Sequence, residues 1–183
     1  MIQFLLVGSG VYLIDTSSLV ELDNKHLVLP GQPARLPSFS VLEQALIWDG
    51  LENLAKNGRG KLIRQVKAEL ERWNPDALNR LKIYPGHRAP NRTPDLVGIY
   101  QNVMSQFPRL IERYPKYDPA DPWIIAMARK YGYAVVTEET PAAEKAKSPR
   151  KTPIPDVCQA LGMTCLNLRG LAELEEWIPK RVS

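Results

Sequence analysis

The stretch "ADPWIIAMARKYGYAVVTEE" (residues 120–139) predicts a helix that leads directly into a strand. Asp and Pro are both common in the first turn of a helix, and the apolar residues after them favour a helix over residues 121–131. The run "AVVT" (134–137) is apolar throughout rather than alternating, as expected of a strand that is covered on both faces. A helix followed by a doubly covered strand is typical of a parallel α/β sheet.

The same alternation of helices and strands extends along the chain. Further strands are expected at 11–14 and 163–168, with weaker candidates at 3–7 and 61–63. Helical patterns are found at 41–57, 64–73, 95–113, 155–161 and 170–177. Because strands that alternate with helices pair in parallel through crossover helices, the sequence predicts a three-layer α/β/α sandwich with a mainly parallel central sheet.

The length of 183 residues is typical of one domain, which we expect to span residues 1–183. Prolines gather at 85–94, 115–122 and 141–155, so 85–118 and 140–155 are predicted to be loop-rich insertions. The two cysteines exclude a disulfide framework and a zinc-type spacing. The apolar N-terminal stretch has neither a basic leader nor the length of a membrane span, which predicts a soluble cytoplasmic protein without a membrane partner.

Acidic residues occur at the positions where a parallel α/β sheet binds its ligands, just beyond the carboxyl ends of the strands. Asp15 directly follows the strand expected at 11–14, and Glu138 and Glu139 follow "AVVT". Asp121 adds a carboxylate at the start of a helix. For Asp15 and Asp121 the alternative interpretation is a helix cap, in which the carboxylate accepts a hydrogen bond from an N–H group of the first turn.

Glu69 is the fourth candidate, because it lies near an apolar stripe of its helix. In "RQVKAELERW" (64–73), Val66, Leu70 and Trp73 form that stripe, and Glu69 is closer to its centre than the other charged residues of the helix. A carboxylate at the border of a buried face must be paired or bind a cation, so a salt bridge is the alternative here. Together, the four acids predict a site for Mg²⁺ or Mn²⁺, which prefer oxygen ligands.

The segments "YLIDTSSL", "VKAELERW" and "ADPWIIAMARKYGYAVVTEE", in this order, resemble the PIN-domain family of metal-dependent nucleases. In that family an Asp ends the first strand, a Glu lies on a middle helix, an Asp opens a later helix, and a further acid follows a strand that ends in Thr. The resemblance runs from Val11 to about Leu171. The "DPWIIA" form and "IPDVC" (154–158) are most similar to a PIN-like branch found beside small DNA-binding antitoxin genes in prokaryotes.

This resemblance implies a ribonuclease that hydrolyses RNA phosphodiester bonds with Mg²⁺ or Mn²⁺, as the toxin of a toxin–antitoxin pair. Asp15 and Asp121 would bind the metal, and Glu69 and Glu139 would complete the site. A small antitoxin would be the protein partner, and the chain would form a homodimer. The sequence departs from the family in two places, since the last acid is Glu139 rather than Asp or Asn, and 85–118 is longer than in compact toxins.

Several other residues have candidate roles. Ser17 and Thr137 are polar neighbours that would orient the carboxylates. The basic part of segment 140–155 is either a loop that holds an RNA backbone or a solvated surface, and its cations are Lys145, Lys147, Arg150 and Lys151. The net charge of +4 is compatible with either interpretation. His26 and His87 lie outside every motif and are expected at the surface.

Two other classes of protein share part of this pattern. A PIN-like module that binds RNA or protein without cutting would have the same fold, although retention of all four acids argues against it. A phosphate-ester hydrolase of the haloacid dehalogenase type would use Asp15 as a nucleophile. That family has a second Asp two residues later, where this chain has Ser17.

Overall fold

The structure of the protein is a computed structural model that describes residues 10–23, 38–83, 85–90, 92–111, 118–145, 147 and 150–180. The strand expected at 3–7 and the residue His26 lie outside these ranges. Among the described residues, no helix is both long and apolar enough to cross a membrane.

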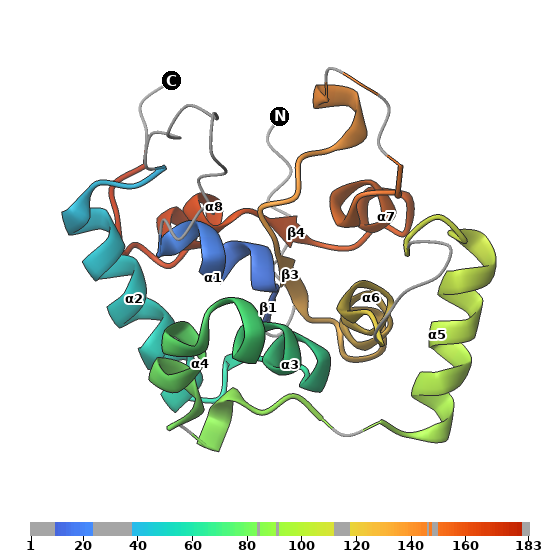
Figure 1. The fold of residues 1–183 in the computed structure, drawn as a ribbon, viewed down its shortest axis with the longest axis horizontal. Coiled ribbons are helices and arrows are strands. Elements are labelled where there is room, and N and C mark those ends of the chain that lie inside the picture. The colour runs from blue at the N-terminus through green and yellow to red at the C-terminus, as the bar shows by residue number, and fades with distance from the viewer. Residues whose placement is uncertain are drawn as a thin grey trace.

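A four-stranded, entirely parallel sheet forms the centre of the molecule, as the sequence predicted (Figure 1). Its strands are β1 (Tyr12–Ile14), β2 (Gly60–Lys61), β3 (Ala134–Val136) and β4 (Cys165–Leu166), and their order in the sheet is β2-β1-β3-β4. Each strand is shorter than its predicted run. β1 pairs with both β2 and β3 and therefore lies inside the sheet, with Leu13 and Ile14 buried.

Helices cover both faces of this sheet, which confirms the three-layer α/β/α sandwich. The helices are α1 (Thr16–Leu22), α2 (Val41–Lys56), α3 (Arg64–Trp73), α4 (Pro75–Lys82), α5 (Pro94–Gln106), α6 (Ala120–Tyr131), α7 (Ile154–Ala160) and α8 (Leu168–Leu174), with 3-10 turns η1 (Pro85–His87) and η2 (Ala142–Glu144). In Figure 1, α2 and α4 lie on one side of the strands, whereas α5, α6 and α7 lie on the other. Helix α6 is buried on nearly all sides because it packs between β3 and α5.

Two helices differ from the sequence prediction for local reasons. Helix α4 was not predicted, although Pro75 occupies its first turn and the Asn74 side chain accepts a hydrogen bond from the N–H of Ala77. Helix α5 ends at Gln106, well before the predicted residue 113. Phe107 has a non-helical backbone and precedes a proline, which disfavours the helical conformation of the residue before it.

The segment 85–90 runs beside β2 and extends this edge of the sheet. The N–H of Leu62 donates to the carbonyl of His87 at 2.7 Å, and the Lys61 ammonium donates to the carbonyl of Gly86 at 2.8 Å. His87 is 3% exposed, so the expectation that it lies at the surface was wrong. The pairing with Leu62 draws the imidazole inside and places Arg88 opposite that residue.

Gly86 makes this close approach sterically feasible, and replacing it should destabilise the fold. A Cβ atom at position 86 would lie 2.3 Å from the carbonyl oxygen of Ala55 and 2.7 Å from the Gly58 nitrogen, both of which are backbone atoms. We expect Gly86→Ala to lower the free energy of unfolding by about 1–3 kcal/mol, as overpacking does. The measurement is urea-induced unfolding followed by circular dichroism.

Gly98→Ala is the matched control. Gly98 lies within α5, and a Cβ atom there would have nothing within 4 Å. Because Ala forms helices better than Gly, this variant should be as stable as the parent or up to about 1 kcal/mol more stable. Equal stability of the two variants would contradict the steric role of Gly86.

Candidate functional site

Asp15 stands at the carboxyl end of β1 with its side chain buried, at 5% exposure. Its Oδ2 accepts hydrogen bonds from the Ser17 hydroxyl at 2.6 Å and from the Thr137 hydroxyl at 3.0 Å. The carboxylate makes no capping hydrogen bond to α1, although Asp15 is the residue at the N-cap position. The capping interpretation is therefore wrong for Asp15, since its carboxylate bonds to the hydroxyls of Ser17 and Thr137 rather than to an N–H group of α1.

Ser17 and Thr137 tie the ends of β1 and β3 together around this carboxylate. Their hydroxyl oxygens are 3.1 Å apart. The Ser17 Oγ accepts a hydrogen bond from the N–H of Glu138, and the Thr137 Oγ1 accepts one from the N–H of Glu139. Each hydroxyl thus connects Asp15 to the backbone that follows β3, and the orientation of Asp15 is held from two sides.

Glu69 projects from the middle of α3 toward the starts of two other helices. It accepts hydrogen bonds from the Thr16 hydroxyl of α1 and from the N–H of Ala120, at the start of α6. Within the described part of the chain, these hydrogen bonds take the place of the salt bridge that was the alternative for Glu69. Burial raises the pKa of Glu69, and the charge of Asp121 raises it further, while the two hydrogen bonds lower it.

Asp121 and Glu139 share one cation, the ammonium group of Lys151. The Nζ atom lies 2.8 Å from the Asp121 Oδ2 and 2.6 Å from the Glu139 Oε1. The N-cap of α6 is Pro119, and Asp121 is the second residue inside the helix, so the capping interpretation is wrong for this residue as well. The other oxygen of Glu139 accepts a hydrogen bond from the N–H of Ile154, where α7 begins.

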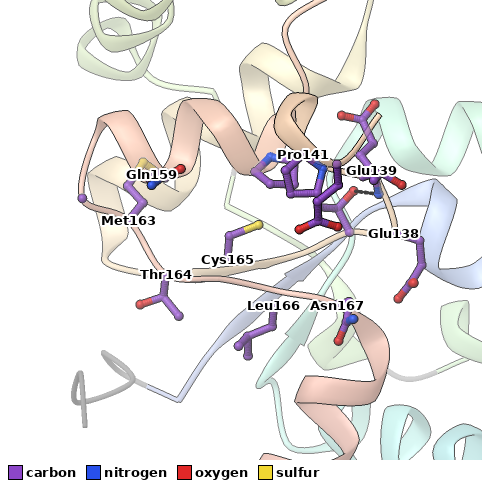
Figure 2. A pocket seen from close by; sticks show the side chains of 14 residues that line it. Glu138, Glu139, Pro141, Gln159, Met163, Thr164, Cys165, Leu166 and Asn167 are labelled. Carbon is purple, nitrogen blue, oxygen red and sulfur yellow. Dashed lines mark hydrogen bonds between the residues drawn. The ribbon is translucent and has the colours of Figure 1, made fainter. Parts of the chain in front are cut away.

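Glu138 points away from this group of acids. Its Oε1 accepts a hydrogen bond from the N–H of Leu168 at the start of α8. Figure 2 shows Glu138 and Glu139 leaving the end of β3 in different directions, as neighbouring side chains of an extended chain do. The structure therefore brings Glu139 toward Asp15 and Asp121, and it brings Glu138 toward α8.

The four acids influence one another electrostatically. Burial is the main cause that raises the pKa of Asp15, and the charges of Glu139 and Glu69 add to it. Burial likewise raises the pKa of Asp121 to about 6; the charge and hydrogen bond of Lys151 oppose this increase, and the charges of Asp15 and Glu139 add to it. Burial alone would lower the pKa of Lys151, but the charges of Asp121 and Glu139 raise it overall.

This charge balance indicates what the site can bind. Four carboxylates lie in this group and one ammonium pairs with two of them, so ionisation of all four leaves excess negative charge in a partly buried place. An oxygen-only ligand set of this kind fits Mg²⁺ or Mn²⁺. As the side chains stand, no three His, Cys, Asp or Glu residues of the described ranges are arranged to hold one ion. Lys151 lies between two of the candidate ligands instead.

The position of Lys151 separates it from the basic loop to which the sequence analysis assigned it. We expected Lys145, Lys147, Arg150 and Lys151 to act together as an RNA contact. Lys145, Lys147 and Arg150 are exposed, whereas Lys151 is directed into the acidic group. Sequence patterns gave no signal for this contact, because residues 121, 139 and 151 belong to three separate segments that only the tertiary fold brings together.

A cavity of about 660 Å³ lies beside Glu139, along the outer edge of β4 (Figure 2). Three glutamates line it, namely Glu138, Glu139 and Glu144, together with the side of β4 that carries Cys165. No lysine or arginine is among its lining residues. An acidic wall of this kind repels phosphate groups, so a nucleic-acid backbone would have to follow a different surface.

The chain matches the sequence profile of a family described as a domain of unknown function (DUF4411) over residues 12–178. This range includes the four acids and Lys151, and the chain belongs to that family. A search of curated proteins found no match to the sequence. The description of the family states no activity, so the function is inferred from the site.

Removal of the Lys151 charge should destabilise the metal-free protein. In Lys151→Met, Asp121 and Glu139 lose the ammonium that they share. Lys151 is 40% exposed, so we discount the cost of a broken buried ion pair to about 1 kcal/mol, which corresponds to a thermal midpoint roughly 2–4 °C lower. The measurement is a thermal melt in chelator, with Lys147→Met as the control at an exposed position of the same loop. Identical midpoints would mean that the bridge adds nothing to stability.

Proposed function

We propose that this member of the DUF4411 family is a Mg²⁺- or Mn²⁺-dependent ribonuclease that hydrolyses RNA phosphodiester bonds. The observation that carries the proposal is the convergence of Asp15, Glu69, Asp121 and Glu139, from four separate elements, on one site with a single ammonium group. These are the residues that match the acids of the PIN-domain family in the sequence. The α/β/α fold, which the alternation of strands and helices predicted, is confirmed by the structure.

Each residue of the site has a distinct part in the proposed reaction. When bound, Mg²⁺ or Mn²⁺ supplies an activated water at neutral pH and neutralises charge on the leaving oxygen. Asp15 and Asp121 are the ligands we assign to the metal, and Glu69 and Glu139 complete the acidic wall. The hydroxyls of Ser17 and Thr137 keep the Asp15 carboxylate in one orientation.

Lys151 has to leave its bridging position before Asp121 and Glu139 can both face a metal ion. Its side chain is 40% exposed, so there is space for the ammonium to turn toward solvent or toward a substrate phosphate. The metal-free protein therefore holds a cation of its own where the divalent ion would act. Divalent ions should raise the thermal midpoint of Lys151→Met more than that of the parent protein, because no ammonium must be displaced.

The same bridge favours one competing function, a PIN-like module that binds RNA or protein without cleaving. In such a module Lys151 would remain in place permanently as the counter-charge of the acids. A haloacid dehalogenase type of hydrolase has less support. The position of its second Asp is occupied by Ser17, which donates a hydrogen bond to Asp15 and cannot act as a carboxylic acid.

The biological setting that we propose is the toxin half of a toxin–antitoxin pair, with a small DNA-binding antitoxin and a homodimeric toxin. Support for this setting comes from the sequence resemblance alone. Expression of the chain with and without the neighbouring gene tests for toxicity, and gel filtration of the purified protein tests for the dimer. A harmless monomer that binds no product of a neighbouring gene would contradict this setting but not the nuclease activity.

The activity itself is tested by cleavage of labelled RNA. We expect the purified protein to cut RNA in Mg²⁺ or Mn²⁺ and to lose this activity in chelator. Asp15→Asn and Asp121→Asn should each reduce the rate by about 100-fold or more, because each removes a carboxylate charge that the metal needs. Asp49→Asn is the control, since it removes the same charge from an exposed position of α2.

Two outcomes would contradict the metal mechanism. One is cleavage that survives chelation. The other is full activity in both Asp15→Asn and Asp121→Asn. Melting curves of each variant in chelator separate a loss of function from a loss of folding. If the parent protein binds RNA but never cleaves it in either metal, the non-catalytic module becomes the better description.

The two glutamates after β3 provide a sharper comparison, because they are neighbours with different partners. Glu139→Gln should reduce activity and weaken its dependence on Mg²⁺ at least about 10-fold more than Glu138→Gln. Glu138→Gln should instead lower stability slightly, because its amide oxygen accepts the hydrogen bond of the Leu168 N–H less strongly than the carboxylate does. The measurements are the rate of cleavage against Mg²⁺ concentration and the thermal midpoint. If Glu138→Gln is the more impaired enzyme, the assignment of the fourth acid is wrong.

A further inference from the structure

A second cavity, of about 350 Å³, lies between α3, α6 and the segment that follows η1. Four cationic residues line it, namely Arg64, Lys67, Arg88 and Arg92. We call this group the basic cleft. Its remaining lining is mainly apolar and comes from Leu62, Ala89, Pro90, Trp123 and Met127, with Gln65 beside them. Neither the basic loop nor the acidic site contributes to it.

Within the part of the chain that the structure describes, most of the positive charge in the basic cleft has no carboxylate beside it. Arg92 is the exception, because it forms an ion pair with Asp118. Among the described residues, no carboxylate is paired with Arg64, Lys67 or Arg88. Burial and the charge of Arg88 both lower the pKa of Lys67, which places these two cations near each other. Two cations that lie close together repel each other, so an anion that binds between them stabilises the arrangement.

The walls of the basic cleft are held by backbone and side-chain contacts. Arg88 is positioned by the hydrogen bonds on either side of it, from the N–H of Leu62 to His87 and from the N–H of Ala89 to Leu62. Arg64 and Lys67 lie in the first turn of α3. The charges are therefore mounted on structured elements rather than on a free loop.

Asp118 contacts the edge of the basic cleft, where it pairs with Arg92. Its carboxylate accepts hydrogen bonds from the Gln65 amide at 2.6 Å and from the Trp123 indole at 3.0 Å. Gln65 lies one turn from Glu69 on α3, and Trp123 lies two residues from Asp121 on α6. At 1.5 Å per residue, Arg64 is only about 8 Å from Glu69 along the helix axis. A nucleic-acid strand has phosphates at spacings of a few ångström, so one strand can reach both places.

Trp123 does not offer a free face on which a base could stack. The Arg92 guanidinium lies 3.7 Å from the centre of its ring, and the ring of Tyr100 stacks with it at 4.3 Å. The basic cleft thus presents charge rather than aromatic surface to a ligand. Contacts of this kind bind a backbone without reading its sequence.

We propose that the basic cleft binds the phosphate backbone of single-stranded RNA next to the acidic site. The choice of RNA over other polyanions rests on the proposed function. The cleft would hold the strand on the α3 side while the scissile phosphate lies at the acids. The acidic cavity along β4 is unsuited to this task, and the basic loop at residues 145–150 is the competing RNA contact.

The test is binding of a fluorescent single-stranded RNA, followed by anisotropy in chelator so that no metal-dependent cleavage occurs. The double variant Arg64→Gln/Arg88→Gln removes two charges from different elements, and neither residue is adjacent to an acid of the site. We expect its affinity for RNA to fall about 10-fold or more at moderate salt. The salt dependence should become weaker: the magnitude of the negative slope of log K against log salt should fall by about 1.4, since each phosphate contact contributes roughly 0.7 for a single strand.

Two matched double variants serve as controls. Lys56→Gln/Lys82→Gln removes two exposed charges from α2 and α4, and Lys147→Gln/Arg150→Gln removes two from the basic loop. Both should change affinity less than about 2-fold and leave the salt slope as it is. Because the cleft cations lack carboxylate partners among the described residues, Arg64→Gln/Arg88→Gln should melt at or above the temperature of the parent protein.

Three results would overturn the proposal. The first is unchanged affinity and salt slope in Arg64→Gln/Arg88→Gln. The second is a larger loss of affinity in the loop variant, which would make residues 145–150 the RNA contact. The third is that inorganic phosphate displaces the RNA when its concentration equals that of the RNA phosphates, which would make the cleft a small-anion site. If RNA binding depends on the cleft but the protein has no nuclease activity, the cleft is confirmed as an RNA-binding site and the proposed nuclease function is rejected.

Discussion

The parallel pairing of β1 with β3 determines where the chemically important side chains of this protein lie. The N–H of Asp15 donates to the carbonyl of Val136 at 2.9 Å, so the two strands end at the same level of the sheet. Asp15 and Thr137 then leave that edge side by side and form a hydrogen bond. The next residues along the chain, Thr16 and Ser17, extend the network to α3 and to the backbone after β3. One pair of short strands thus organises contacts among four segments.

Two surfaces of opposite charge lie on α3 and α6, with Gln65 of the basic cleft one helical turn before Glu69 of the acidic site. On one side, desolvated carboxylates share the ammonium of Lys151. On the other side, the cations at positions 64, 67 and 88 lack a carboxylate partner among the described residues. Each surface carries the charge that its proposed ligand would neutralise, a divalent cation in the first case and RNA phosphates in the second. This complementarity follows from the placement of helix faces, because side chains one turn apart on α3 face both surfaces.

The sequence by itself determined the class of fold and the location of the acids along the elements. Apolar runs without alternation predicted strands covered on both faces, and their alternation with helices predicted a parallel sheet. The predicted bounds of helix 64–73 agree with α3. These features were readable because periodicity, turn residues and strand ends are local properties of the chain. Helix α4 was missed although its start, Asn74 followed by Pro75, is also a local signal.

Only the tertiary structure decided which partner each charged residue has. Asp15 is the N-cap residue of α1 and Asp121 lies in the first turn of α6, yet their carboxylates face hydroxyl groups and Lys151 rather than helix N–H groups. Tertiary contacts also decide the role of Glu139, which faces Asp15 and Asp121, whereas its neighbour Glu138 accepts a hydrogen bond at the start of α8. Tertiary pairing likewise buries His87, because its carbonyl accepts a hydrogen bond from the N–H of Leu62. The physical reason is that hydrogen bonds and ion pairs join groups that are distant in sequence, and their energy depends on burial and distance, which only the folded chain defines.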